Sequence, residues 1–243
     1  MSEPLHSNRF PGESDAYRSA RNELLQAEMK LRRNIEEVAA LRRKLPLGGK
    51  VQQDYLFDEG SPDLDNSAST RETRLSELFE PGKDTLALYS YMYGPAMAAP
   101  CVSCTSILDG LNGTAPHVSQ RINFAVVAKS PLERIRTVAR ERHWRNLRLL
   151  SSANNNYNHD YFGEDPKGNQ FPSLNIFVRR DGAIYHVFHT ELLFAPPEPG
   201  QDGRHVDMIW PLWNLFDFTP EGRGEKWYPR LSYDPTARIA MSS

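Results

Sequence analysis

The sequence has no apolar run that approaches the roughly 20 residues needed to span a membrane as a helix. Its N-terminal residues also lack the apolar core of a signal peptide. We therefore expect a cytoplasmic protein that is neither secreted nor inserted in a membrane.

An excess of charge of one sign is missing too. The 243 residues carry 29 basic and 31 acidic side chains, so the formal net charge is -2. A nearly neutral protein produces no overall field that would concentrate polyanions or anionic lipid at its surface. Nucleic acids and membranes are therefore not expected as partners. Hydrophobic residues make up 39% of the chain, which is enough to build a core at this length.

Cysteine is scarce, since Cys101 and Cys104 are the only two in the sequence. A secreted domain held together by disulfides carries a larger and more dispersed set, so that class is excluded. Two thiols three positions apart in a reducing compartment point instead to redox chemistry or metal binding.

The N-terminal part of the chain predicts an arm followed by a helix. Residues 1–13 are polar and contain turn formers, which predicts a mobile arm. Over residues 15–45, apolar side chains recur at steps of three and four until Pro46 ends the pattern. A long amphipathic helix is therefore predicted within residues 14–49. We expect it to pack on the rest of its own domain; the alternative is that it pairs with a second copy in a homodimer.

The middle of the chain alternates strand and helix patterns. A buried strand, a helix, a second strand and a second helix are predicted over residues 85–93, 105–118, 122–128 and 132–142. Ser130 would cap the second helix and Pro131 would be its first residue. Both cysteines fall between the first strand and the first helix. A β-α-β-α series of this kind forms a parallel sheet.

The C-terminal half contains a loop and a hairpin. Residues 151–170 are rich in Asn, Asp and Gly, which predicts a long loop. An Asp-Gly turn joins two predicted strands at residues 173–180 and 183–189, and this dipeptide is a strong hairpin signal. Residues 206–216 are aromatic and predict a further helix.

The cysteine spacing carries the chemistry. A thiol exchanges with a disulfide only as a thiolate, and the unpaired backbone N–H groups of a first helical turn lower its pKa. Cys101 sits where this effect is largest. Cys104 lies three residues further on nearly the same helical face, so it can attack a mixed disulfide formed at Cys101. The spacing therefore fits Cys101 as the nucleophile and Cys104 as the resolving thiol, and it implies no cofactor.

A second segment supports the same fold. The sequence Phe171-Pro172-Ser173-Leu174-Asn175-Ile176-Phe177 resembles the segment of thioredoxin-like proteins whose proline faces the cysteines. In those proteins this proline is cis, and a cis peptide is almost confined to proline. The resemblance implies that Pro172 shapes a groove for an extended partner, and that Phe171 and Ser173 belong to it.

Further short motifs cover the chain from about residue 15 to about residue 225. They are Ala20-Arg21-x-x-Leu24-Leu25, Arg42-Arg43-x-Leu45-Pro46, Asp54-Tyr55-x-Phe57-Asp58, Tyr91-Met92-Tyr93-Gly94-Pro95, Cys101-x-Ser103-Cys104, Val187-Phe188-His189-Thr190 and Asp217-Phe218-Thr219-Pro220-x-Gly222-Arg223. Together they resemble DUF899, a bacterial family of thioredoxin-like proteins near the peroxiredoxin and AhpC-TSA branch. The resemblance implies an α/β thioredoxin-like domain over residues 50–225, with a long helix before it, an inserted loop before the proline strand, and an irregular tail over residues 226–243.

Three features depart from related patterns. Val102 stands where relatives commonly have proline, so the direction of the redox reaction stays open. Thioredoxins carry a buried carboxylate on the strand before the cysteines, but no acid occurs here between Asp84 and Asp109. The peroxiredoxin pattern Pro-x-x-x-Thr/Ser-x-x-Cys fails at both cysteines. We therefore expect a thiol-disulfide oxidoreductase acting on a protein or small-molecule disulfide or thiol, and a peroxidase is disfavoured.

Other readings of the cysteines stay open. They could be inert buried thiols of a non-catalytic thioredoxin-like module that binds a protein or a small ligand. They could also hold zinc, together with histidines. His186 and His189 are three apart on a predicted strand, however, and strand alternation sends them to opposite faces. At most one could join the cysteines, so we expect no metal.

Remaining candidates lie outside the cysteine motif. Tyr93 belongs to a family-like motif and is a candidate substrate contact, as are Asn158 and Asp160 in the long loop, which could fold over the thiols. Turn formation alone explains the two loop residues and is favoured. Five basic residues could grip an anion, although a solvated helix face is the favoured interpretation: Arg136, Arg140, Arg142, Arg145 and Arg148.

Overall fold

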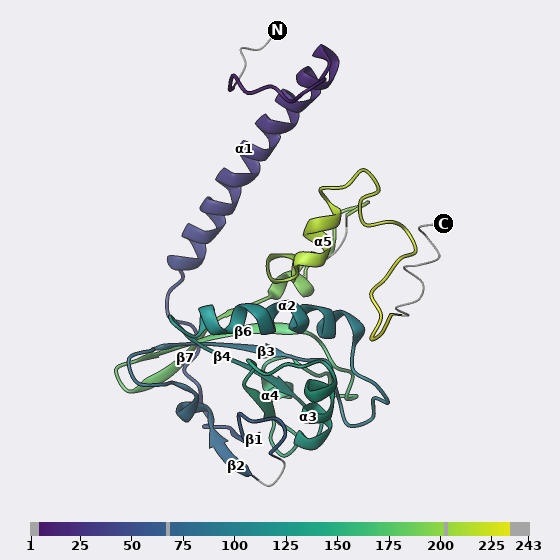
Figure 1. Cartoon of the computed structure of the whole chain (residues 1–243). Helices are drawn as coiled ribbons and strands as arrows, with labels where there is room; N and C mark the ends of the chain where they lie inside the picture. Colours follow the sequence, from purple (N-terminus) through teal and green to yellow (C-terminus); the bar gives the residue numbers. More distant parts are fainter. Residues whose placement is uncertain (1–4, 67–68, 202–203, 234–243) are drawn as a thin grey trace. The chain divides into compact units, whose positions relative to one another are not determined.

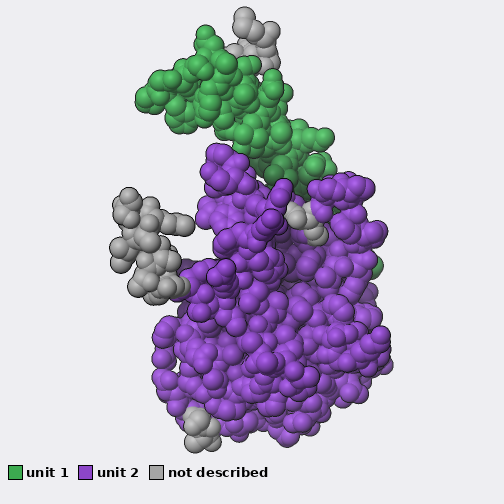
Figure 2. Space-filling view, turned by 90° about the vertical axis from the view of Figure 1, so that its right-hand side faces the viewer, with its two compact units in different colours: residues 1–46 green, residues 47–243 purple. Residues whose placement is uncertain are grey.

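The computed structural model describes residues 5–66, 69–201 and 204–233. The chain divides into two compact units, Met1–Pro46 and Leu47–Ser243, which are coloured separately in Figure 2. The predictions for residues 1–4 of the arm and 234–243 of the tail lie outside the described residues.

Unit 1 is built on one helix, α1 (Asp15–Arg43). Ser14 caps it by accepting a hydrogen bond from the Tyr17 amide at 3.2 Å, and its first and last turns carry acidic and basic residues respectively, as the helix dipole favours. The helix predicted from the periodicity of residues 15–45 is confirmed. Its apolar stripe is not covered within the unit, since Leu31 is 58% and Leu41 is 65% exposed. Packing on the domain and pairing in a homodimer both remain predictions for this stripe.

Unit 2 is built around one sheet (Figure 1). Its strands are β1 (Leu56–Gly60), β2 (Thr70–Arg74), β3 (Thr85–Ser90), β4 (Asn123–Ala128), β5 (Leu149–Ser151), β6 (Ser173–Arg180) and β7 (Ala183–His189). Its helices are α2 (Val102–Val118), α3 (Leu132–Glu141), α4 (Tyr157–Asp160) and α5 (Pro211–Phe216), with 3-10 turns η1 (Leu75–Leu78), η2 (Glu191–Leu193) and η3 (Asp207–Ile209). None of the helices in the described parts of the chain is both long and apolar enough to cross a membrane.

The strand order is β2-β1-β5-β4-β3-β6-β7. The three central strands β5, β4 and β3 run parallel, which confirms the predicted β-α-β-α series. The β6-β7 hairpin and the β1-β2 pair flank them in antiparallel pairing. In register, Ser90 at the end of β3 pairs with Ser173 at the start of β6. The chain therefore leaves β3 for the cysteines at the same sheet edge where it enters β6 from Pro172.

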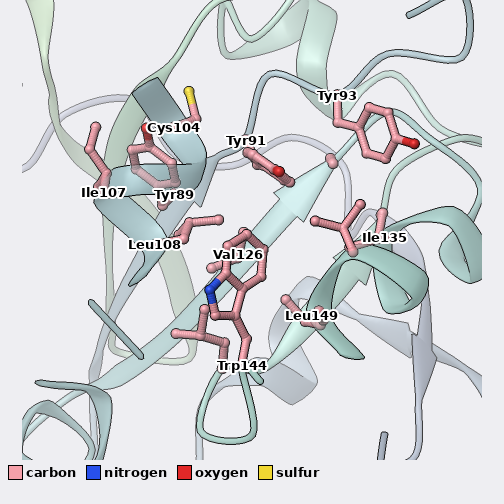
Figure 3. Close-up of a cluster of buried hydrophobic side chains, with 14 of the residues drawn as sticks. Tyr89, Tyr91, Tyr93, Cys104, Ile107, Leu108, Val126, Ile135, Trp144 and Leu149 are labelled. Carbon is pink, nitrogen blue, oxygen red and sulfur yellow. The ribbon is translucent and has the colours of Figure 1, made fainter. Parts of the chain in front are cut away.

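Side-chain alternation along the central strands gives the sheet two apolar cores. Val126 and Ala128 of β4 pack with α2 and α3, whereas Ala125 and Val127 pack with α4 and the η1 turn. Cys104 belongs to the first core, so we call that side the cysteine face and the other side the opposite face. Figure 3 shows Cys104 at the margin of the first core, beside tyrosines of β3.

The predicted hairpin is confirmed with its turn. Asp181 and Gly182 have φ angles of 50° and 74°, both in the left-handed region that a tight two-residue hairpin turn requires. Within β7, however, the register shifts: Phe177 pairs with His186, whereas Ile176 pairs with Phe188. One residue is thus extra on β7, and such a bulge reverses the side-chain alternation beyond it.

The bulge corrects our expectation for the two histidines. An uninterrupted strand would send His186 and His189 to opposite faces, but their rings lie 6.5 Å apart by their centroids. His186 also packs against Phe177, a member of the core of the opposite face. Both histidines therefore lie on the face away from the cysteines.

Three local predictions were wrong. Ser130 does not cap α3: the N-cap is Pro131, and the Ser130 hydroxyl donates instead to the Gly94 carbonyl at 3.2 Å. The segment predicted as a loop contains the short helix α4, and the β5 strand before it was missed. The aromatic segment of residues 206–216 is interrupted at Trp210 between η3 and α5.

Candidate functional site

The cysteines lie where β3 gives way to α2. Cys101 is the N-cap of the helix, with an extended backbone, and its amide donates to the Met92 carbonyl at 3.0 Å. Its own carbonyl accepts from the Thr105 amide and hydroxyl, at 3.0 and 2.8 Å. These bonds fix the Cys101 backbone on both sides and leave the sulfur facing the first turn of the helix.

The two thiols are free and differ in environment. Cys101 is partly exposed, whereas Cys104 is only 1% exposed. A hydrogen bond from the Cys104 thiol lowers the pKa of Cys101 to about 6, and the amides of Ser103 and Cys104 act in the same direction against the opposing effect of burial. Burial raises the pKa of Cys104 well above its usual range, and the neighbouring Cys101 raises it further. At neutral pH the pair therefore holds one thiolate and one thiol.

Two tyrosines under the thiols were not picked out from the sequence. Tyr89 and Tyr91 alternate along the end of β3 and are 0% and 1% exposed on the cysteine face. The Tyr91 hydroxyl is hydrogen-bonded to the Thr105 hydroxyl at 2.8 Å. The Tyr89 hydroxyl has no such partner among the described residues; it lies beside Cys104, whose pKa it lowers. The period-two spacing of tyrosines in TLALYSYMY was the available signal.

Pro172 enters at the same sheet edge but not with the expected geometry. No peptide bond is cis in the described residues, so the cis proline implied by the resemblance is wrong for this structure. An isolated antiparallel bridge pairs Glu164 with Gln170 just before Pro172, and the Phe171 amide donates to the Gly163 carbonyl at 2.9 Å. Phe171 and Pro172 are partly exposed, whereas Ser173 is fully buried.

The remaining candidates, Tyr93, Asn158 and Asp160, lie in different parts of the domain. Tyr93 lies in the core of the cysteine face at 6% exposure, and the Arg134 guanidinium covers its ring at 4.5 Å from the centroid. Asn158 is buried and accepts a hydrogen bond from Ser152 at 2.7 Å. Asp160 accepts from the Tyr55 hydroxyl at 2.7 Å, in the core of the opposite face. Asp160 thus lies across the sheet from the cysteines, whereas Asn158 donates to Gln170, which directly precedes Phe171 and Pro172.

The basic residues are engaged within the protein. Arg136 donates to three backbone carbonyls of the β1-β2 connection, and Arg148 binds Glu59 at 2.6 Å. Arg140, Arg142 and Arg145 each form an ion pair with an acidic side chain. Acidic partners therefore neutralise four of the five residues, and Arg136 uses its guanidinium to hold a backbone segment.

No metal centre is formed by the residues that the structure describes, because no three His, Cys, Asp or Glu side chains come close enough to hold an ion.

The strand order, the parallel β3-α2-β4 unit and the cysteine pair at the start of α2 define a thioredoxin-like α/β protein, as expected. Over residues 7–234 the chain matches the family described as "Bacterial protein of unknown function (DUF899)". The protein belongs to this family, which confirms the resemblance. No functionally curated protein matches the sequence.

Solved structures similar in fold include members of the peroxiredoxin group. AhpC of Mycobacterium tuberculosis is 12% identical, with a TM-score of 0.45 over 73% of this chain and 97% of its own. AhpC of Enterococcus faecalis is also 12% identical, with a TM-score of 0.44 over 75% and 98%. A putative thioredoxin reductase from Burkholderia cenocepacia is 11% identical, with a TM-score of 0.42 over 65% and 90%.

Proposed function

We propose that the protein is a thiol-disulfide oxidoreductase in which Cys101 is the nucleophile and Cys104 the resolving thiol. The observation that carries the proposal is the asymmetry of the pair: an acidified, partly exposed sulfur at the start of α2 lies beside a buried, neutral one. This is the distribution that exchange needs, since the attacking sulfur must be charged and open to the substrate.

The reaction proceeds through two exchanges. The Cys101 thiolate attacks one sulfur of a substrate disulfide, forming a mixed disulfide and releasing the other substrate sulfur as a thiolate. Cys104 then loses its proton to solvent or to the released thiolate and attacks the Cys101 sulfur. This releases the second substrate thiol and forms the Cys101–Cys104 disulfide. The substrate gains two electrons, the protein loses two, and an external dithiol returns the protein to its starting state. The same steps in reverse oxidise a dithiol.

The raised pKa of Cys104 sets the order of these steps. While Cys101 is a thiolate, its negative charge disfavours ionisation of Cys104. Formation of the mixed disulfide removes that charge, so Cys104 ionises more readily when its attack is needed. The Tyr89 hydroxyl then has a charged sulfur to donate to.

The substrate groove in this proposal runs over Cys101 at the edge where Pro172 precedes β6. Phe171 and Pro172 are exposed enough to touch an extended partner. The buried Ser173 and Tyr93 support the groove from beneath. Asp160 is not included, because it lies on the opposite face, and neither is Asn158, which is buried and bonded to Ser152 and Gln170.

Alkylation with iodoacetamide at graded pH tests the proposal. The Cys104→Ser variant reports on Cys101 alone, and Cys101→Ser reports on Cys104 alone. In the wild-type protein we expect Cys101 to react with a midpoint near pH 6 and Cys104 to stay unreactive up to strongly alkaline pH. The midpoint should rise in Cys104→Ala, which removes the donor, more than in Cys104→Ser, whose hydroxyl still donates, because the hydrogen bond from the Cys104 thiol is the largest single cause of the low pKa. Slow reaction of both cysteines with the profile of an ordinary thiol would favour a non-catalytic binding module instead.

A further inference from the structure

A cavity of about 610 Å³ opens on the opposite face, beside β7 and the η2 turn. Five aromatic rings contribute to its wall: Tyr161, Phe162, His186, His189 and Phe194. None of the residues used in the proposed thiol chemistry contributes to it. The β7 bulge creates this wall, because without it only one of the two histidines would face the cavity.

His189 contributes an aromatic surface to the wall and not a polar one. It is 6% exposed, its two ring nitrogens are buried, and the Tyr161 backbone is a polar neighbour of the ring. Its ring is held by stacking on Phe194, with centroids 5.3 Å apart and an interplanar angle of 15°. A ligand in the cavity would therefore meet ring carbons at this position and not a hydrogen-bonding nitrogen.

His186 is held in a fixed orientation. Its Nε2 lies 2.9 Å from the Asn175 Oδ1, an acceptor, so Nε2 carries the proton. Burial lowers the pKa of His186 to about 4, and burial also lowers the pKa of His189. Both rings are therefore neutral near pH 7 and present flat aromatic faces rather than positive charge.

The rim of the cavity is strained and apolar. Phe162 has a φ angle of 55°, in the left-handed region that a bulky residue avoids, and its ring is 61% exposed. The ring lies edge-on to His189 at 6.4 Å and to Phe194 at 5.7 Å. Backbone strain of this kind is typical of ligand sites, where it holds a side chain in the position that binding requires.

The charged side chains of the wall limit the class of ligand that the cavity can bind. Asp160 and Glu191 are the charged side chains of the wall, and it contains no Lys or Arg. An anion would meet two carboxylates without a compensating cation. A neutral or cationic planar compound would meet ring faces suited to stacking and to cation-π attraction.

We propose that this cavity binds a planar aromatic compound, uncharged or cationic, that stacks among the rings of Tyr161, Phe162 and Phe194. The site lies across the sheet from the cysteines, so it is independent of the proposed redox function.

Isothermal titration calorimetry with three probes tests the proposal: indole, tryptamine and indole-3-acetate. All three share the indole ring, but tryptamine is a cation and indole-3-acetate an anion. The test variant is Phe162→Ala, which removes an exposed ring. Leu192→Ala is the matched control, because Leu192 is a 57% exposed apolar neighbour outside the wall.

For the wild-type protein, indole and tryptamine should bind with dissociation constants below about 1 mM. Indole-3-acetate should bind more weakly than tryptamine, because it would meet the two carboxylates of the wall. In Phe162→Ala the binding of all three probes should weaken, whereas Leu192→Ala should behave as wild type.

The proposal is overturned if indole does not bind or if the anion binds as tightly as the cation. Because Phe162 is mostly exposed, we expect Phe162→Ala to fold as the wild type does. Unchanged binding in Phe162→Ala would also overturn the proposal.

Discussion

The two faces of the sheet carry ionisable groups whose pKa values are lowered with opposite effects on charge. On the cysteine face, helix amides and a neighbouring thiol lower the pKa of Cys101, so that a charged sulfur persists at a partly exposed position. On the opposite face, burial lowers the pKa of His186, so that a normally titrating ring stays neutral. Both pKa values fall, but the first shift creates a charge near neutral pH and the second prevents one.

The difference shows which part of the chain sets each environment. The charge on Cys101 depends on the start of α2, a local feature of consecutive residues. The neutral histidines depend on residues far apart in sequence, since Phe177 and Tyr161 cover them from β6 and the loop after α4. A substitution should therefore affect one face without the other, which Cys101→Ser tests directly, and the other substitutions test what sets the environment of a single face.

The largest effect is expected from Cys101→Ser. A serine hydroxyl does not ionise near neutral pH, so reduction of insulin disulfides should fall on the order of 10³-fold or more. Indole affinity at the opposite face should stay unchanged, since Cys101 is no part of that wall. Insulin turbidity and calorimetry measure the two responses. Turnover that survives the substitution would remove Cys101 from the mechanism.

Tyr89→Phe should act on the second exchange only. Its hydroxyl is the side chain that lowers the pKa of Cys104, and it has no competing hydrogen-bond partner in the described structure. Without it, Cys104 attacks about tenfold more slowly, the effect expected of one hydrogen bond to a developing charge. A mixed disulfide with a thiol-reactive substrate should accumulate, which mass spectrometry detects, while the alkylation midpoint of Cys101 stays near pH 6.

Tyr91→Phe is the matched control for Tyr89→Phe. The Tyr91 hydroxyl already has a partner in Thr105, so its removal should cost about 1 kcal/mol of stability without trapping the mixed disulfide. Equal accumulation of mixed disulfide in the two variants would mean that general packing under α2, rather than the Tyr89 hydroxyl, controls the second exchange.

The sequence predicted those features that depend on neighbouring residues. The Asp181-Gly182 turn predicted where β6 ends and β7 begins, because two successive left-handed residues form a two-residue hairpin turn. The apolar strand patterns and the cysteine spacing likewise placed the thiols between β3 and α2. These signals are local, and the structure follows them to within a few residues.

Features set by long-range packing were not predictable. The bulge in β7 has no glycine to mark it, yet it moves His189 to the same face as His186. Strand β5 has three residues, too few for a period to emerge, and it forms by pairing with β4 and β1. The opposite placement of the Asp160 loop follows from its contact with Tyr55, which lies 105 residues away.

Acidification should weaken the fold through His186. The pKa is about 4 in the folded state and about 6.5 in the unfolded chain, so between these values the unfolded state binds more protons. The stabilisation is therefore complete above about pH 6.5 and is lost as pH falls toward 4. Urea unfolding at pH 7 and pH 4.5 should show a smaller loss of stability in His186→Gln, which keeps a donor for Asn175. Equal losses in wild type and variant would show that His186 does not contribute.

The smallest effect is expected from Ser103→Ala, and it decides what acidifies Cys101. The Ser103 hydroxyl acts in the same direction as the amides of α2 but is the weakest of the causes, and it also hydrogen-bonds the Tyr228 hydroxyl. Its loss should raise the alkylation midpoint by less than about half a pH unit, because the backbone amides and the Cys104 thiol remain. Tyr228→Phe, which removes the partner and keeps the serine, should shift the midpoint no further. A rise in Ser103→Ala toward the value of an ordinary thiol would mean that the Ser103 hydroxyl, rather than the Cys104 thiol and the backbone amides, sets the charge on Cys101.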